Sequence, residues 1–391
     1  MKTENKNILI GITSSIASYK IYELIRLFKK NNLNVKIVTT QNALEFISPL
    51  VIETLSENKC FYNQFESREN VEHISLTNWA DIFVIAPASA NTISKCAQGL
   101  ADNLLTSIFC AYLGSKKPIL FAPAMNTGMW ENPIIQENIK KLKLLNCDFI
   151  EPQNGFLACG TTGKGRLADI DLIYQQTLRN LFQNKNNNNK KLIVTLGGTK
   201  EQIDSVRYIT NSSSGKMGTA LADWAYYLGY NVTVISTIEL KRNYKIINTN
   251  TALEMLEALE KKDYDYLIMS AAVGDFRAEN ISKTKISKEN INSDFNLKLI
   301  KNPDVVATIA QNKKENQKII GFCLTDKNLI ECAKAKLENK KLDFIIANEV
   351  KTALNTNQNK VTIIEKSGKI IDIELDSKEN IALKILEVVC D

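Results

Sequence analysis

Short runs of apolar and β-branched residues alternate along this chain with longer stretches of helical periodicity, and this alternation constrains the fold more than any other feature. After the first run, Ala17, Ile21, Leu24, Ile25 and Phe28 fall on one side of a helix. Such a stripe packs on a sheet, and strands that alternate with helices are typical of parallel sheets covered on both faces. We therefore predict an α/β fold with two doubly wound parallel sheets, flavodoxin-like or Rossmann-like.

The predicted strands are rich in Val, Ile and Phe. Ligands of doubly wound sheets bind beyond the carboxyl ends of the strands, so the residues that follow each run are the candidates for a site. A hairpin that turns at Ser367 and Gly368 is expected in KVTIIEKSGKIIDIEL. The strands are NILIGIT, VKIVTT, ADIFVIAP, KPILFAPA and CDFIEP in the first half, and LIVTLGG, NVTVIST, YDYLIMSAAV, KIIGFCL and LDFIIAN in the second.

The run NKNNNNKK, which begins at Asn184, separates the two halves. A polar, low-complexity segment buries too little apolar surface to order itself, so we interpret it as a linker. A length of 391 residues suits two domains of ordinary size. We expect a first domain over 1–183, a linker over 184–190 and a second domain over 191–391.

Charge, cysteine content and hydropathy limit the partners, metal sites and compartments that suit this chain. The net charge of +6 is spread over both halves, so nothing favours a nucleic-acid partner. The eight cysteines form no CxxC pair and there is one histidine, which argues against a zinc site. The N-terminal sequence lacks the pattern of a signal peptide, and no segment has the roughly 18 apolar residues of a membrane span. We expect a cytoplasmic protein without a membrane partner.

Polar residues follow the strands of the first half where a ligand is expected. Gly11, Ser14 and Ser15 lie at a helix N-terminus, which favours an anion, although an ordinary helix cap has the same appearance. Thr39, PASANT and PAMNTGMW follow the next three strands. The motif GxGxxG is absent, so a mononucleotide is favoured over a dinucleotide. The single histidine, His73, could equally be an ordinary interior residue.

Two sets of motifs resemble known enzymes. GITSSIASYK, VEHISL, PASANT, DNLL, PAMNTGMW and LACGTTGKGR occur in an order and spacing that resembles the FMN-dependent cysteine decarboxylases. GGTKEQIDSVRYITNSSSGKMG, AAVGDFR, KNPD and ANEV resemble phosphopantothenate-cysteine ligase. Together they cover nearly the whole chain, which therefore resembles the bacterial bifunctional coenzyme A biosynthesis enzymes that combine phosphopantothenoylcysteine decarboxylase with this ligase.

The resemblance implies the roles of the decarboxylase residues. His73 would be the base near the substrate thiol, Asn126 would hold the departing carboxylate, and Cys159 would donate a proton when the enethiol is reduced. Decarboxylation of a cysteine-derived acid needs an electron sink, which FMN would provide. Cys159 lies in a polar, glycine-rich stretch that suits a lid over the substrate. The implied FMN contacts are Gly11, Ser14, Ser15, Thr39, Ser89, Asp102 and Asn103.

The resemblance also implies a ligase that uses CTP and Mg2+ to activate 4'-phosphopantothenate as an acyl-CMP, which cysteine attacks. Asn211 would act on the acyl-cytidylate. Lys285 would reach the phosphates from a loop, although an ordinary solvated lysine fits this position almost as well. No metal ligands are implied, whereas homo-oligomers are: trimers for the decarboxylase and dimers for the ligase. The remaining implied CTP contacts are Asp275, Asn302, Pro303, Asp304, Phe322, Lys336 and Lys340.

The chain departs from the family pattern at three places: Thr161 in ACGT, Ser287 in KTKISK, and Cys323-Leu324-Thr325 in GFCLTD. The first concerns the lid and the others concern the CTP site. A chain that is active only as a decarboxylase would also be consistent with these departures.

Two different classes of protein would share part of this pattern. The first is an NAD(P)-dependent oxidoreductase with tandem nucleotide-binding domains, and the missing GxGxxG counts against it. The second is an FMN-binding regulatory subunit, which would not need His73, Asn126 and Cys159 together.

Overall fold

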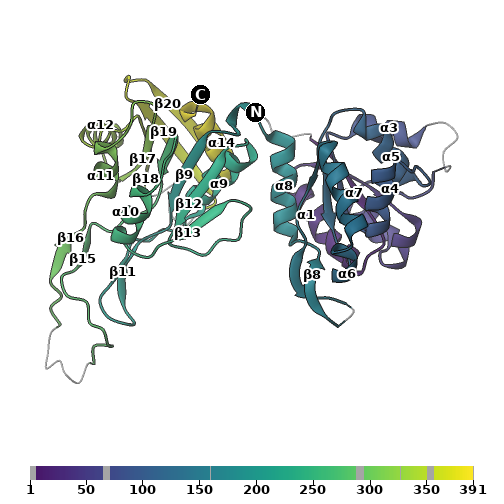
Figure 1. Ribbon diagram of the computed structural model, residues 1–391. Coiled ribbons are helices and arrows are strands. Elements are labelled where there is room, and N and C mark those ends of the chain that lie inside the picture. Colours follow the sequence, from purple (N-terminus) through teal and green to yellow (C-terminus); the bar gives the residue numbers. More distant parts are fainter. Residues whose placement is uncertain are drawn as a thin grey trace. The chain divides into compact units, whose positions relative to one another are not determined.

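The structure is a computed structural model that describes residues 6–64, 71–158, 160–287, 295–325, 327–349 and 356–390. The chain forms two compact units, Met1–Phe182 and Gln183–Asp391. Each unit is built around its own large sheet with helices packed on it (Figure 1). The prediction of two doubly wound α/β domains is confirmed.

The sheet of the first unit has six parallel strands in the order β3-β2-β1-β4-β5-β6. The direction of chain progression reverses between β1 and β4, and ligands of such sheets bind at this switch point. All five predicted strands are present, whereas β3 is too short to give a periodic signal. The bounds are β1 Asn7–Ile12, β2 Asn34–Thr39, β3 Cys60–Phe61, β4 Ile82–Ala88, β5 Ile119–Pro123 and β6 Cys147–Phe149.

The helices of this unit pack on the sheet through apolar stripes. Four residues of the predicted stripe, Ile21 to Phe28, are buried on α1. The stretch before it, Ile16–Lys20, is a 3-10 turn, η1, so Ala17 lies outside the α-helix. Phe83, Phe109 and Phe121 belong to the buried cluster between the sheet and α5. The helices are α1 Ile21–Lys30, α2 Pro49–Ser56, α3 Glu72–Trp79, α4 Ala90–Gln98, α5 Leu104–Leu113, α6 Thr127–Trp130, α7 Pro133–Leu144 and α8 Ile170–Phe182.

The glycine-rich stretch around residue 159 forms an antiparallel hairpin, in which β7 (Gln153–Phe156) pairs with β8 (Thr162–Arg166). Sequence reasoning expected a loop here, because these strands contain few apolar residues. Cys159 lies between the two strands in sequence and outside the described residues.

The main sheet of the second unit has the order β13-β12-β9-β14-β17-β18-β19-β20. Six strands are parallel, and β19 and β20 extend the sheet as an antiparallel pair. The predicted hairpin is confirmed, with Gly368 at a φ of 91° in its turn. The bounds are β9 Lys191–Leu196, β12 Asn231–Ser236, β13 Lys245–Asn248, β14 Tyr266–Met269, β17 Lys318–Thr325, β18 Phe344–Glu349, β19 Gln358–Glu365 and β20 Ile370–Ser377.

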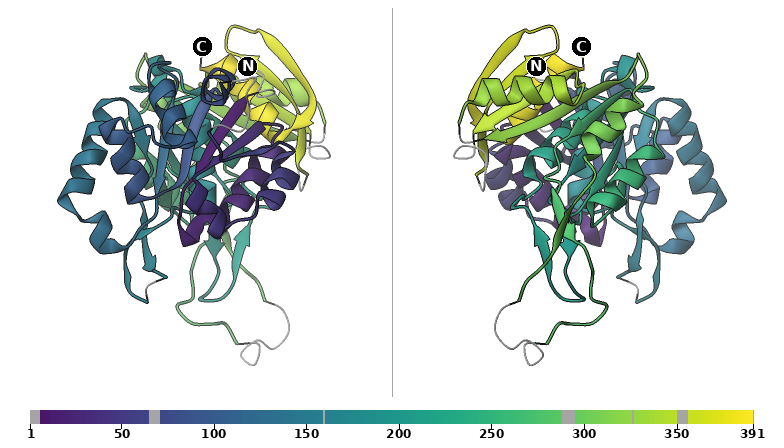
Figure 2. Two further views of the ribbon diagram at one scale, coloured as in Figure 1. Left: turned by 90° about the vertical axis from the view of Figure 1, so that its right-hand side faces the viewer. Right: turned by 90° about the vertical axis from the view of Figure 1, so that its left-hand side faces the viewer.

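Helices lie on both faces of this second sheet. α9 (Lys216–Tyr227) packs on β9 and β12 and against α14 (Lys378–Val389). Right-handed crossovers on the other side of the switch point place α10 (Ala252–Glu260), α11 (Val305–Gln311) and α12 (Leu329–Asn339) on the opposite face. Two small antiparallel pairs extend away from the main sheet (Figures 1 and 2): β10 (Lys200–Gln202) with β11 (Tyr208–Thr210), and β15 (Phe276–Ala278) with β16 (Leu299–Lys301).

The asparagine run differs from the unordered linker that its composition suggests. Residues Lys185–Asn187 form a 3-10 turn, η3, and Asn187 is 8% exposed. The N–H of Asn184 and the side-chain amide of Asn187 both donate to the carbonyl oxygen of Leu228. The polar composition did not predict an ordered segment, because the run is stabilised by hydrogen bonds to the end of α9 and not by burial of apolar side chains.

Candidate active sites

The carboxyl ends of β1 and β4 are joined by one buried side chain, Thr13. Its hydroxyl donates to the carbonyl oxygen of Pro87 over 2.7 Å and accepts from the N–H of Ser89 over 2.9 Å. A hydroxyl can donate and accept at once, and this one is fully buried. Thr13 thereby fixes Ser89, a predicted flavin contact, at the switch point of the sheet.

The predicted phosphate contacts lie where β1 leads into η1. Ser15 begins η1, and its hydroxyl accepts from the N–H of Ala17 over 3.3 Å, as a helix cap does. Gly11 is buried inside β1, where a Cβ would come 3.0 Å from Leu105. Close packing is therefore sufficient to explain this glycine. Contact of Gly11, Ser14 and Ser15 with a flavin phosphate stays a prediction.

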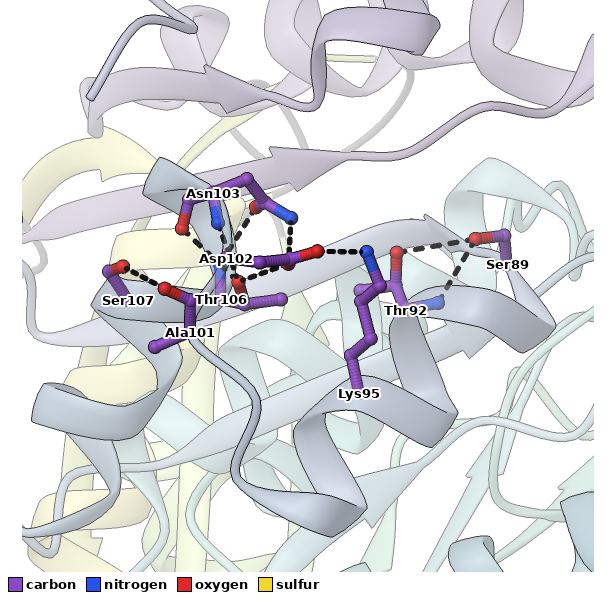
Figure 3. A network of polar contacts seen from close by, with 8 residues as sticks. All are labelled: Ser89, Thr92, Lys95, Ala101, Asp102, Asn103, Thr106 and Ser107. Carbon is purple, nitrogen blue, oxygen red and sulfur yellow. Dashed lines mark hydrogen bonds and ion pairs between the residues drawn. The ribbon is translucent and has the colours of Figure 1, made fainter. Parts of the chain in front are cut away.

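Asp102 and Asn103 belong to a polar network in front of α5 (Figure 3). Nζ of Lys95 lies 2.5 Å from Oδ2 of Asp102, and the Asn103 amide donates to Oδ1 over 2.9 Å. Asn103 also caps α5 by accepting from the N–H of Thr106 over 3.1 Å. The hydrogen bond from Lys95 is the main reason why the pKa of Asp102 lies below its usual range. Sequence reasoning missed Lys95, because α4 ends at Gln98 and the helical period therefore does not relate Lys95 to Asp102.

Ser89 lies at the other side of the same network. Its hydroxyl accepts from the N–H of Thr92 over 3.4 Å and so caps α4. Figure 3 shows the Lys95 side chain between Ser89 and the carboxylate of Asp102. Three predicted FMN contacts, Ser89, Asp102 and Asn103, therefore lie together at the starts of α4 and α5.

Three threonine hydroxyls in the first unit are buried without a hydrogen-bond partner among the described residues: those of Thr39, Thr40 and Thr127. Thr39 ends β2, Thr40 follows it, and Thr127 begins α6 after β5. A buried polar group without a partner costs about 1–3 kcal/mol. These groups at carboxyl ends of the sheet fit a cofactor that brings its own polar atoms, as a flavin mononucleotide does.

The hairpin of β7 and β8 lies directly on the loop that contains Asn126. The N–H of Met125 donates to the carbonyl oxygen of Gly165 over 3.0 Å. A Cβ at Gly165 would overlap with the carbonyl oxygen of Met125, and one at Gly163 would overlap with the hydroxyl of Thr127. Only glycine permits this approach, so β8 lies close to the loop from which Asn126 caps α6.

His73 is the second residue of α3, which packs against α5. The hydroxyl of Thr77 donates to its carbonyl oxygen over 2.7 Å. At the departure from the family pattern, the carbonyl oxygen of Thr161 accepts from the N–H of Leu157 over 2.8 Å. Because Cys159 lies outside the described residues, the grouping of His73, Asn126 and Cys159 in one site stays a prediction.

A cleft of about 810 Å3 opens at the carboxyl edge of the second sheet. Lys285 is not among the residues that line it, whereas three residues that sequence reasoning did not choose, Lys216, Asn348 and Lys378, are. Predicted residues that are far apart in sequence therefore meet in one cavity. Those that line it are Asn211, Asp275, Asn302, Pro303, Asp304, Phe322, Lys336 and Lys340.

Two asparagine side chains hold the wall of this cleft. The amide of Asn211 donates to the carbonyl oxygen of Val273 over 3.1 Å, and that of Asn302 donates to the carbonyl oxygen of Gly274 over 2.8 Å. A Cβ at Gly198 would come 2.5 Å from the carbonyl oxygen of Asn211. The segment after β14 and the backbone at Asn211 are therefore closely fixed.

Asp304 and Lys340 form an ion pair of 2.9 Å at the side of the cleft. Asp304 also caps α11 by accepting from the N–H of Ala307 over 3.1 Å. Burial alone would raise the pKa of Asp304, but the hydrogen bonds from Lys340 and from the backbone outweigh burial and lower it. Asp304 therefore stays ionised and paired with Lys340.

Ile286, the residue after Lys285, makes hydrogen bonds through both its N–H and its carbonyl oxygen. The N–H of Ile286 donates to Oδ2 of Asp204 over 3.1 Å, and the carbonyl oxygen of Ile286 accepts from Arg207 over 2.6 Å. Asp204 is 1% exposed and pairs with Arg207 at 3.1 Å. Sequence reasoning missed this pair, although both residues stand in the motif IDSVRYIT. The pair orients the chain on the C-terminal side of Lys285.

The departure at Cys323-Leu324-Thr325 changes the cleft at one position. Cys323 is fully buried in the core of the second unit, and the hydroxyl of Thr325 donates to the carbonyl oxygen of Lys327 over 3.0 Å. Leu324 is 41% exposed and lines the cleft. Leu324 is therefore the residue through which this departure can affect a ligand. Ser287, the other departure in this unit, directly follows Ile286.

The described ranges contain neither a cluster of metal ligands nor a membrane-spanning helix. No three side chains of His, Cys, Asp or Glu within them lie together as a metal site would require. None of the helices described above has the length and apolar content needed to cross a bilayer.

Comparison with known proteins identifies both units. Residues 1–182 match the family model "Flavoprotein", and residues 187–391 match "DNA/pantothenate metabolism flavoprotein C-terminal domain". The coenzyme A biosynthesis bifunctional protein CoaBC of Borreliella burgdorferi is 44% identical over 98% of this chain and 99% of its own length. That of Haemophilus influenzae is 36% identical over 100% and 98%. The solved structure of the FMN binding protein AtHal3 is 36% identical over 44% of this chain and 94% of its own, with a TM-score of 0.39.

The two bifunctional relatives cover 98% and 100% of this chain, which includes both units, and share more than a third of their residues with it. The chain thus belongs to the family of coenzyme A biosynthesis bifunctional proteins.

Proposed function

We propose that the two units catalyse consecutive steps of coenzyme A biosynthesis. The second unit would join 4'-phosphopantothenate to cysteine with CTP through an acyl-CMP, and the first would decarboxylate the product to 4'-phosphopantetheine. The chain is a bifunctional enzyme with a decarboxylase and a ligase. That residues 1–183 and 191–391 act as separate catalytic domains is part of the proposal.

The cleft of the second unit is the observation that carries the proposal furthest. It collects residues of four separate sequence motifs, from Asn211 to Lys340, in one cavity of about 810 Å3. Such a cavity is large enough for a nucleotide together with part of an acid. Its walls provide amides, lysines and the carboxyl groups of Asp275 and Asp304, which suit a triphosphate and its metal ion.

In the first unit, Ser14, Ser15 and Thr39 would hold FMN together with the group of Ser89, Asp102 and Asn103. The unpartnered hydroxyls of Thr39, Thr40 and Thr127 support a polar cofactor at this edge. When bound, the flavin supplies the oxidation of the substrate thiol and the later return of the hydride.

The residues of the chain would move the protons of this reaction. His73 would take the proton of the substrate thiol, and the amide of Asn126 would donate hydrogen bonds to the carboxylate that leaves as CO2. Cys159 would protonate carbon when the enethiol is reduced, which explains a thiol in a polar, glycine-rich hairpin. The hairpin itself would exclude water from the substrate.

In the second unit, the ligase residues would neutralise and orient CTP. Lys336, Lys340 and Lys285 would face its phosphates with Mg2+, and Asn302 and Phe322 would contact the nucleotide. Asn211 would orient the acyl-CMP for attack by the amine of cysteine, since its carbonyl and its amide are both fixed by neighbours. Positioning of this kind is a large part of the catalysis of acyl transfer.

Supplying phosphopantothenate, cysteine, CTP and Mg2+ tests the proposal directly. We expect 4'-phosphopantetheine and CO2, one pyrophosphate per turnover, and phosphopantothenoylcysteine when the flavin is removed. Mass analysis of the released chromophore should give FMN. Failure to release pyrophosphate would exclude the ligase, and a chromophore other than FMN would exclude the decarboxylase assignment.

The assembly is a separate part of the proposal. By analogy with the family we propose trimers through the first unit and dimers through the second, with FMN sites between protomers. Analytical ultracentrifugation of the full chain should then give a mass that is a multiple of both the trimer mass and the dimer mass. The mass of a monomer would contradict this.

A further inference from the structure

A second cavity, of about 660 Å3, lies in the second unit at the edge of the sheet where β17 and β18 begin. The ligase cleft opens at the opposite edge, where the same strands end. The second cavity is enclosed by α11, α12 and the turn between β19 and β20, and both helices lie on one face of the sheet (Figure 1). Its volume is typical of small-molecule sites.

Buried apolar side chains form the floor of this cavity. Ala310 of α11, Leu337 of α12 and Ile364 of β19 line it, and all three belong to the core of the second unit. Leu342, which follows α12, lines it as well and is buried. A ligand with an apolar part would therefore bind against the core through the hydrophobic effect.

The rim of the cavity carries unpaired lysines. Lys334 of α12, Lys341 after this helix and Lys366 in the turn after β19 line the cavity and are exposed. Within the described parts of the chain, none of these three lysines forms an ion pair. Lys313 differs from them, because its Nζ lies 2.7 Å from both carboxylate oxygens of Asp343. The cavity thus has three ammonium groups that are available to a ligand.

Two carboxyl groups share this rim and limit the charge of a ligand. Glu338 of α12 and Glu365 at the end of β19 line the cavity. Three unpaired lysines and two glutamates leave an excess of one positive charge. A single negative charge therefore suits the rim, whereas the nearly two charges of a phosphate monoester exceed it.

We propose that this cavity binds a small amphipathic carboxylate, whose apolar chain covers the floor and whose one negative charge meets the lysines. Aliphatic and aromatic acids of modest size belong to this class. Nucleotides do not, because they carry more charge and less apolar surface. The binding itself does not depend on the proposed function of either unit.

α12 connects this cavity to the ligase cleft. Lys334 and Leu337 of this helix line the cavity, whereas Lys336, between them, lines the cleft. Leu342 lines both and so forms part of the wall between them. A Cβ at Gly321 of β17 would come 2.6 Å from Cδ1 of Leu342, so this side chain is closely packed against the sheet. A ligand that shifts α12 or Leu342 would change the nucleotide site, and the cavity would act as an effector site. This coupling rests on the proposed ligase function.

Fluorescence of anilinonaphthalene sulfonate tests the binding in the full chain with its flavin. This probe is an aromatic monoanion that becomes bright in apolar surroundings. Hexanoate should displace it. Hexanol, which has the same chain length and no charge, should need a concentration at least about fivefold higher, as expected for the loss of an exposed ion pair. Equal displacement by hexanoate and hexanol would overturn the proposal.

Variants from separate elements locate the probe. Lys334→Glu and Lys366→Glu each replace an attraction by a repulsion and should weaken the displaceable binding by about tenfold. Gln311→Trp places a large side chain from exposed Gln311 of α11 in the cavity and should abolish this binding. Lys245→Glu, at an exposed lysine of β13 outside the cavity, is the control and should bind like the parent protein.

The variants should keep pyrophosphate release at saturating substrates, which shows that they fold. Unchanged binding in any of the three cavity variants would overturn the site. A loss in Lys245→Glu as large as that in Lys334→Glu would do the same.

Steady-state kinetics tests the coupling. Hexanoate should change KM for CTP by at least about twofold, and CTP should change the affinity for hexanoate by the same factor, because coupling between two sites is reciprocal. Gln311→Trp should show neither effect. Displaceable binding without such a change would keep the site and exclude its coupling to the ligase. Displaceable binding in a protein that releases no pyrophosphate would exclude the ligase and keep the site.

Discussion

Replacement of Gly198 by alanine should separate the two activities of the chain. A Cβ at this position would come 2.5 Å from the carbonyl oxygen of Asn211. Carbon and oxygen atoms need about 3.3 Å in such a contact, so the backbone at Asn211 has to move by about 0.8 Å. A misplacement of about 1 Å can cost a reaction about 100-fold. We expect Gly198→Ala to lower kcat/KM of the ligase by about 30- to 100-fold, or about 2–2.7 kcal/mol.

The assay follows pyrophosphate for the ligase and CO2 from phosphopantothenoylcysteine for the decarboxylase, in the same preparation. Decarboxylation should be unchanged because Gly198 lies in the other unit. Gly274→Ala is the matched control in the same cleft: its Cβ would meet Cγ of Glu201 at 3.3 Å, so a shift of only a few tenths of an ångström is needed. It should cost the ligase less than about threefold. Full ligase activity of Gly198→Ala, or an equal loss in Gly274→Ala, would refute the reasoning.

Three further outcomes are expected. Cys159→Ser should bleach the flavin once and release about one CO2 per site without accumulating phosphopantetheine, because serine cannot replace the thiol as an acid; His73→Asn should not bleach, and repeated turnover by Cys159→Ser would exclude Cys159 as the donor. Asp275→Asn should lose CTP-dependent pyrophosphate release and keep decarboxylation, and equal loss of both would contradict the division of labour. Burial raises the pKa of Cys147 from 9.0 to about 12. Between these pH values the thiol ionises only in the unfolded chain, so the free energy of unfolding should fall by about 1.4 kcal/mol per pH unit. Urea titrations in which Cys147→Ala and the parent protein show the same dependence of this free energy on pH would contradict the prediction.

Much of the fold follows from local patterns in the sequence. The β-branched runs predict the central strands of both sheets, and the rule that ligands bind at carboxyl ends places Thr39 and Ser89 at one edge of the first sheet. Asp102 lies between two helices and was predicted only from the resemblance to the family. Short or polar strands such as β3, β10 and β15 give no such pattern. Their order depends on partners elsewhere in the chain, as the order of the asparagine run depends on Leu228.

The parts of the site that sequence reasoning missed are those set by long-range contacts. The hydroxyl of Thr13 meets Pro87 across 74 positions, and Lys216 meets Asn357 across 141. Neither spacing is a period of a helix or a strand, so no local rule predicts it. Lys378 looks like an ordinary helix-start lysine until the sheet brings α14 beside α9.

The link that Thr13 makes between two strand ends has a thermodynamic consequence. Most of the groups that would bind FMN come from the ends of β1, β2 and β4, with Asp102 and Asn103 at the start of α5, and they meet only when the first unit is folded. An unfolded chain therefore has no binding site. Because FMN would bind only the folded state, its binding would shift the unfolding equilibrium toward that state. At a free flavin concentration 100 times Kd this linkage adds about 2.7 kcal/mol to the stability of the first unit. The supply of FMN would thus set how much of this unit survives proteolysis in the cell.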